Sequence, residues 1–229
     1  MRLEEINNLL DPKPMALEMG YERLPDGVLH VACRTDMPGC RGDMLAWWFQ
    51  FRPTTQQYVW WNPIDHVSSQ WQHSANTATH IGSIHQVEES FAGSPVRQLL
   101  IQLVDPAEHF DTALLSAALT GKQVSQIIVG RGGESWEAPR DPQGRVLGSR
   151  LFHVCRDTDW GMVLRSHFYL GCDLPASGHT PDQLATLIPE SVGPALLTHC
   201  YSEFTFLSRF LPSMFIAENR HVRPPRSPW

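Results

Sequence analysis

The chain lacks most features of secreted and nucleic-acid-binding proteins. Its five cysteines are odd in number and form no CxxC pair, so neither a disulfide framework nor a structural zinc knuckle is expected. It has no basic run, and its net charge is −6. Because phosphate binding requires clustered lysine and arginine, no nucleic-acid surface is expected.

Long apolar runs are also missing. No stretch is long enough to cross a bilayer, and the N-terminus carries acids where a signal peptide would have a basic and then an apolar region. We therefore expect a cytoplasmic protein with no membrane partner. Hydrophobic residues make up 42% and charged residues 18% of the 229 positions, which predicts one globular domain over 1–229. Residues 1–27 would form a helical extension and 213–229 a loose tail, and a homodimer is plausible because dimers are common assemblies.

Period-two alternation of apolar residues predicts several strands, and one long helix follows them near the C-terminus. The predicted strands cover 27–34, 79–93, 97–105 and 125–132, followed by a hairpin of 149–157 and 161–171 around the turn DTDWG. Gly193 and Pro194 would open the long helix and Pro212 would end it. This order predicts an α+β domain in which a curved antiparallel sheet wraps around the C-terminal helix and leaves a cavity between them.

That helix contains the segment LLTHCYSEF, in which an imidazole and a carboxylate share an apolar stripe. The stripe follows the i, i+3, i+4 spacing of one helix face and comprises Leu196, His199, Cys200, Glu203, Phe206, Leu207 and Phe210. A bare carboxylate there is costly unless it holds a proton, whereas a divalent metal shared by His199 and Glu203 removes the difficulty. The alternative is a hydrogen-bonded pair at the edge of a core.

Two other segments add candidate ligands for the same ion. Glu89 lies on a strand face with Val87 and Phe91, while Glu88 points the other way, and the aromatic-rich YVWWNPIDH ends in His66. Together His66, Glu89, His199 and Glu203 form a mixed nitrogen and oxygen set that favours Zn²⁺ over Fe²⁺ or Mn²⁺. His85 shares the face of Glu89 and is the rival ligand.

The segments MLAWWFQF…YVWWNPIDH, HQVEESFAG, GMVLRSHFYLG and LLTHCYSEF occur in the order seen in the diacetylphloroglucinol hydrolase and phloretin hydrolase family, which the chain resembles over most of 28–205. The resemblance implies a Bet v 1-like helix-grip fold. It also implies a zinc-dependent hydrolase that cuts the C–C bond between an acyl group and a polyhydroxylated aromatic ring. By position, the resemblance assigns the four metal ligands to His66, Glu89, His199 and Glu203.

The resemblance also suggests residues that contact the aromatic ketone substrate. Tyr58 matches a tyrosine that contacts ring oxygens, His153 and Tyr169 match a polar pair facing the substrate, and Ser69 replaces an amide that binds a ring hydroxyl. We expect His153 to deliver a proton, since an unperturbed imidazole pKa suits that work. Four tryptophans would line an apolar pocket for the flat ring: Trp47, Trp48, Trp60 and Trp61. A cyclase or isomerase on the same scaffold, and a non-enzymatic carrier of hydrophobic ligands, remain alternatives.

Overall fold

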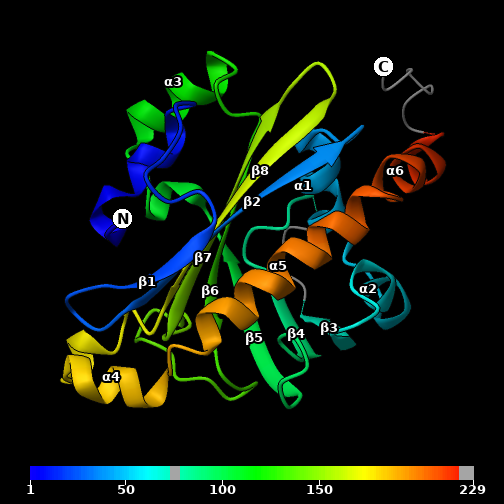
Figure 1. Cartoon of the computed structure of the whole chain (residues 1–229). Helices are drawn as coiled ribbons and strands as arrows, with labels where there is room; N and C mark the ends of the chain where they lie inside the picture. The colour runs from blue at the N-terminus through cyan, green and yellow to red at the C-terminus, as the bar shows by residue number, and fades with distance from the viewer. Residues whose placement is uncertain (73–77, 222–229) are drawn as a thin grey trace.

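The structure is a computed structural model, and it describes residues 1–72 and 78–221. Its centre is one eight-stranded antiparallel sheet with the strand order β1-β2-β8-β7-β6-β5-β4-β3 (Figure 1). Each strand expected from the alternation is present. The strands are β1 Gly20–Arg23, β2 Leu29–Pro38, β3 His66–Gln72, β4 Ile84–Glu89, β5 Arg97–Val104, β6 Gln126–Gly133, β7 Ser149–Asp157 and β8 Gly161–Leu170.

The long C-terminal helix α5 (Val192–Ser208) lies across one face of this sheet, as Figure 1 shows. Its buried side includes Leu196, His199, Cys200, Glu203 and Leu207, as the helical spacing predicted. Phe204 is buried as well, whereas Phe206 and Phe210 are only half-buried. The expected α+β helix-grip architecture is therefore confirmed.

Two further helices close the end of the grip near the C-terminus of α5. They are α1 (Gly42–Phe51) and α2 (Thr55–Trp61), and their aromatic side chains join the core between the sheet and α5. At the start of α1 the carboxylate of Asp157 accepts a hydrogen bond from the Gly42 backbone N–H at 2.9 Å. The aromatic-rich segment that ends in His66 begins within α2.

The opposite face of the sheet has its own core. It is covered by the 3₁₀ helix η1 (Leu3–Leu10) and by α3 (Thr112–Thr120), and it buries Leu9, Phe152 and Tyr169. The shorter helical segments are η2 (Pro106–Glu108), η3 (Pro175–Ser177) and α4 (Pro181–Leu187). Among the described residues, no helix is both long and apolar enough to cross a membrane.

Both ends of the chain differ from the expected extensions. Residues 1–27 contain strand β1, which pairs with β2, in addition to η1. Pro212 does not end the helical region, because it occupies the first turn of a further helix, α6 (Leu211–Asn219), where a missing backbone N–H costs nothing. The predicted tail is therefore helical up to residue 219, and residues 222–229 lie outside the described part of the chain.

Candidate functional site

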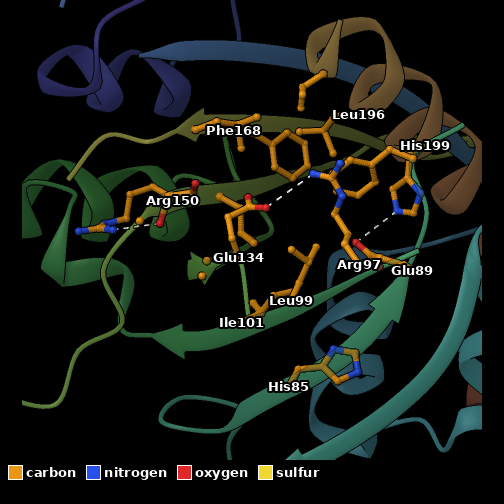
Figure 2. Close-up of a pocket in the computed structure, with 18 of the residues that line it drawn as sticks. His85, Glu89, Arg97, Leu99, Ile101, Glu134, Arg150, Phe168, Leu196 and His199 are labelled. Carbon is orange, nitrogen blue, oxygen red and sulfur yellow. Dashed lines mark hydrogen bonds and ion pairs between the residues drawn. The ribbon is translucent and has the colours of Figure 1, made fainter. Parts of the chain in front are cut away.

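A cavity of about 510 Å³ lies between the sheet and α5. Its lining is mostly apolar, with Leu99, Ile101, Phe168 and Leu196 among the side chains that Figure 2 labels. Such a space suits a small organic ligand. One part of the wall differs, because several buried ionisable groups converge there.

The convergent groups come from three elements that are distant in sequence. His66 begins β3, Glu89 ends β4, and His199 lies in the middle of α5; one ligand atom from each falls within 4.8 Å of the other two. His66 Nε2 lies 3.7 Å from a carboxylate oxygen of Glu89 and 3.7 Å from one of Glu203, which follows His199 by one helical turn. The structure thus brings His66, Glu89 and His199 together as one group and places Glu203, the fourth predicted ligand, beside His66.

The orientation of His66 leaves one ring nitrogen open toward this cluster. Its Nδ1 lies 2.8 Å from the backbone carbonyl oxygen of Tyr58 and must donate, because a carbonyl can only accept. Nε2 therefore carries a lone pair, and it has no hydrogen-bond partner among the described residues although it is buried. Burial, followed by the neighbouring His199, lowers the pKa of His66 to about 2, so the ring is neutral and able to bind a metal.

His199 is oriented in the same way by a carboxylate. Its Nδ1 donates to Asp65 at 3.0 Å, and Asp65 also accepts from the Ser90 hydroxyl at 2.8 Å and the Ala92 N–H. The hydrogen bond with His199 holds the pKa of Asp65 well below its usual range. A carboxylate behind a histidine is the usual outer support of a metal ligand, and it directs Nε2 of His199 toward the cluster.

The buried carboxylates and His199 shift one another's pKa values strongly. Burial raises the pKa of Glu89. Burial also raises the pKa of Glu203 to about 8, because it outweighs the lowering by His199 and is reinforced by the charge of Glu89. Burial alone lowers the pKa of His199, but Glu89 and the other carboxylates raise it to about 9. Tyr58 donates its hydroxyl to Glu89 and stacks on the His66 ring at 3.7 Å. Buried carboxylates and open imidazole nitrogens at these distances fit a divalent metal ion.

Two histidines near the cluster are held differently. His85, the rival ligand, lines the cavity but contacts the Ser69 hydroxyl at 2.8 Å and stacks on Trp71 at 3.8 Å. Ser69 also contacts the Pro53 carbonyl at 3.1 Å and does not line the cavity. Contrary to the expected substrate contact, Ser69 therefore lies behind the cavity wall. Its hydroxyl contacts His85 and the backbone at Pro53 instead.

His153 lines the cavity as expected, but its environment is not that of an ordinary imidazole. It contacts the Ser166 hydroxyl at 2.8 Å and packs against Phe49 and Phe204. Burial lowers its pKa to about 3. The expectation of an unperturbed pKa near 6.5 is wrong, and a neutral ring faces the cavity.

Tyr169 lies on the other face of the sheet. It packs against Phe152 and His30 in the second core, because alternate residues of β8 point to opposite faces. Its neighbour Phe168 lines the cavity instead. The predicted substrate contact of Tyr169 is therefore corrected.

Of the four tryptophans predicted to line the cavity, one lines it and three do not. Trp61 lines it and contacts the His66 ring. Trp48 is fully buried against Trp61, Trp47 packs against Phe215 of α6, and Trp60 is 50% exposed. Trp47, Trp48 and Trp60 thus support the helices and not the cavity wall, contrary to expectation.

Sequence reasoning missed two charged residues of the site. Asp65 directly precedes His66, and an acid adjacent to a predicted ligand is the signal in the sequence that could have indicated it. Arg97 lines the cavity from the first position of β5. Its place followed from the alternation of that strand, since Arg97, Leu99 and Ile101 share one face.

The helix-grip fold, the ligand-sized cavity and the buried His/Glu cluster together define the class of this protein. It is a helix-grip domain with a cavity for a small molecule and a candidate metal centre beside it. Residues 1–216 match the family model described as the DAPG hydrolase PhiG domain. The chain belongs to this family.

Several curated proteins are similar to the chain. It is 27% identical over 233 residues to 2,4-diacetylphloroglucinol hydrolases of a Pseudomonas species and of Pseudomonas protegens, covering 93% of this chain and 76% and 72% of those proteins. It is 25% identical over 217 residues to phloretin hydrolase of Eubacterium ramulus, covering 87% and 72%.

Solved structures resemble the chain more distantly. Protein Ms6760 from Mycobacterium smegmatis is 10% identical, with a TM-score of 0.46 over 85% of this chain and 97% of that one. Ara h 8.0201 is 10% identical, with a TM-score of 0.44 over 82% and 99%.

Proposed function

We propose that the protein is a zinc-dependent hydrolase that cleaves the C–C bond between an acyl group and a polyhydroxylated aromatic ring. The products are a carboxylic acid and the deacylated phenol. The observation that carries this proposal is the convergence of His66, Glu89, His199 and Glu203 beside an apolar cavity, with His66 Nε2 buried and unpartnered. Membership in a family whose relatives are named as hydrolases of an acylphloroglucinol and of phloretin supports the same reaction.

Zinc fits the donor set better than the alternatives. Two imidazole nitrogens and carboxylate oxygens are ligands that Zn²⁺ accepts, and Fe²⁺ and Mn²⁺ are the rivals. When bound, the ion would polarise an oxygen atom or lower the pKa of a coordinated water. Asp65 and the Tyr58 carbonyl orient the two imidazoles in advance. His66 Nε2 is open as it stands, and Nε2 of His199 would bind the ion after losing its proton.

The reaction adds the oxygen of water to the acyl carbon and a proton to the ring carbon that carried the acyl group, while the bond between these carbons breaks. His153 is the candidate for moving this proton. As a neutral imidazole it can accept at one nitrogen and donate at the other, and the Ser166 hydroxyl beside Nδ1 completes such an exchange. Trp61 and Phe168 offer apolar surfaces against which a flat ring can pack.

The experiment combines metal analysis with product analysis. The purified protein is expected to hold about one zinc per chain and to release acetate from an acetylated phloroglucinol. His199→Ala and Glu203→Ala should each lose both properties while remaining folded by circular dichroism. Turnover retained in either variant would contradict the metal assignment, and a rearranged product without free acid would indicate an isomerase. A protein that binds the ketone without metal or turnover would be a carrier.

A further inference from the structure

Arg97 is a cation placed next to the candidate metal cluster. In the β4–β5 register it pairs directly with Glu89, so both side chains leave the sheet on the same face. Figure 2 shows the Arg97 side chain extending through the cavity, with the contact between Glu89 and His199 beside it.

The contacts of the Arg97 guanidinium are loose. It lies over the Phe91 ring at 5.1 Å from the centroid, and one nitrogen is 3.6 Å from a carboxylate oxygen of Glu134. The side chain of Glu134 is 65% exposed, so this ion pair is screened by water and contributes little to stability. Among the described residues the guanidinium makes no further hydrogen bond or ion pair, which leaves several of its five N–H donors available.

The other arginine of the cavity wall is not available in this way. Arg150 makes two parallel hydrogen bonds to Asp173 at 2.7 and 2.8 Å, and it also donates to the Ser149 carbonyl. Its guanidinium is therefore engaged in holding the strand ends. The contrast identifies Arg97 as the cavity arginine that can exchange its partner for a ligand.

A ligand of the proposed reaction carries a matching charge. The acyl carbonyl withdraws electrons from the ring and makes the neighbouring hydroxyls acidic, so an acylated polyhydroxyphenol ionises to a phenolate more readily than an ordinary phenol. A guanidinium forms short, charge-assisted hydrogen bonds with such an oxyanion. The carboxylate product offers the same anionic oxygen chemistry.

We propose that Arg97 binds the phenolate oxygen of the ring, with the substrate oxyanion taking the place of Glu134. This inference rests on the proposed function for the identity of the ligand. Arg97 then selects rings with a free, ionised hydroxyl and fixes their orientation relative to His66, Glu89, His199 and Glu203. Phe91, which stacks beneath the guanidinium, holds Arg97 in the position needed for this contact.

The probe is 2-nitrophloroglucinol, whose nitro group replaces the acyl group, acidifies the ring and leaves no acyl bond to cut. Its trimethyl ether keeps the ring and the nitro group, is larger by three methyl groups, and cannot ionise. Dissociation constants are measured by calorimetry on the metal-loaded protein. Arg97→Gln is expected to weaken binding of the nitrophenol about tenfold or more, the value of a charged hydrogen bond, and to leave the ether unaffected.

Glu134→Gln is the matched variant, and it is expected to change the affinity for the nitrophenol in the opposite direction. Removing the competing carboxylate should tighten nitrophenol binding by roughly two- to fivefold, the range of an exposed ion pair, again without effect on the ether. Arg97→Lys should fall between wild type and Arg97→Gln. Because Glu134 is exposed, its variant is informative even if Arg97→Gln folds poorly.

Three results would overturn the inference. Equal weakening of the nitrophenol and its ether by Arg97→Gln would mean that Arg97 only shapes the cavity, and unchanged nitrophenol binding would mean that it does not contact the ring. Acetate binding that falls in Arg97→Gln while nitrophenol binding does not would assign the site to the acid product. Wild-type turnover of an acetylated phloroglucinol is measured on the same preparation. Absence of turnover would contradict the proposed function, whereas the binding result for Arg97 would still stand.

Discussion

Buried histidines lie on both faces of the sheet, and the protein satisfies them in different ways. On the outer face, His30 uses both ring nitrogens within the protein, contacting Glu22 at 2.8 Å and His167 at 2.9 Å. On the cavity face, His66 and His199 each use only Nδ1 for an orienting contact, and His66 Nε2 has no partner among the described residues. Burial of a histidine is therefore not the signal of a site; an oriented ring with an open nitrogen beside buried carboxylates is.

The sharpest way to break this comparison is to change two adjacent acids that point to opposite sides of β4. Glu89 belongs to the cluster, whereas Glu88 accepts hydrogen bonds from Ser68 and Gln98. Glu89→Gln is expected to lower metal affinity more than about a hundredfold, beyond the range for outer-shell partners, and to abolish turnover. Glu88→Gln should retain both. Metal content and acid release measure both properties. If Glu88→Gln lost them and Glu89→Gln kept them, the functional face of β4 would be the one that carries Glu88.

The pKa values of His199 and Glu203 predict a strong pH dependence of metal binding. In the metal-free protein the pKa is about 9 for His199 and about 8 for Glu203, so both groups hold a proton below pH 8. A metal must displace these protons, and its affinity should fall roughly tenfold per pH unit for each proton as the pH decreases. Chelator competition between pH 6 and 9 measures the slope. Glu203→Gln should reduce it by one proton, and a flat profile in the wild type would contradict the assignment.

Asp65 tests whether the orienting carboxylate contributes to the open nitrogen of His199. Asp65→Asn keeps the shape but removes the charge behind the ring, and metal affinity should fall about 10- to 100-fold. The control is Glu22→Gln, which changes the acid next to His30 on the outer face and should leave metal affinity as in the wild type. Equal affinities in all three proteins would mean that Asp65 serves the fold alone.

The smallest expected difference separates two buried tyrosines. Tyr58 donates to Glu89, so Tyr58→Phe should slow turnover roughly tenfold, the value of one hydrogen bond to a charged group. The Tyr169 hydroxyl is buried without a partner among the described residues. Tyr169→Phe should leave turnover unchanged and leave the free energy of unfolding unchanged or raised by about 1 kcal/mol, because an unsatisfied polar group is removed. Slower turnover in Tyr169→Phe would return that residue to the site.

Periodicity predicted the parts of the site that depend on a single element. The helical spacing placed His199 and Glu203 on the buried side of α5, and the strand alternation separated Glu89 from Glu88. Both predictions need only the local repeat of 3.6 or 2 residues. The order of strands and the final long helix likewise predicted the helix-grip arrangement.

The failures required knowledge of how elements meet. His153 pairs with Ser166 in the β7–β8 hairpin, so Phe168 shares the face of His153 and Tyr169 does not. The register of the hairpin decides this, and strand periodicity alone does not give the register. Trp47 packs against Phe215 of α6, a helix that the sequence did not predict, and Trp48 packs against Trp61 and Phe210. The pKa of His153 depends on burial by Phe49 and Phe204, which come from other elements.

The ligands of the candidate metal centre also join distant parts of the polypeptide. Asp65, next to His66, and His199 are 134 positions apart, and the ion would fasten the last long helix to the β3–β4 edge of the sheet. An ion bound by the folded chain alone stabilises it by about 4 kcal/mol when its free concentration is a thousand times its dissociation constant. Loss of the ion would therefore weaken the attachment of α5 to the sheet and abolish the proposed activity together. The supply of metal would then control the lifetime of the folded protein as well as its activity.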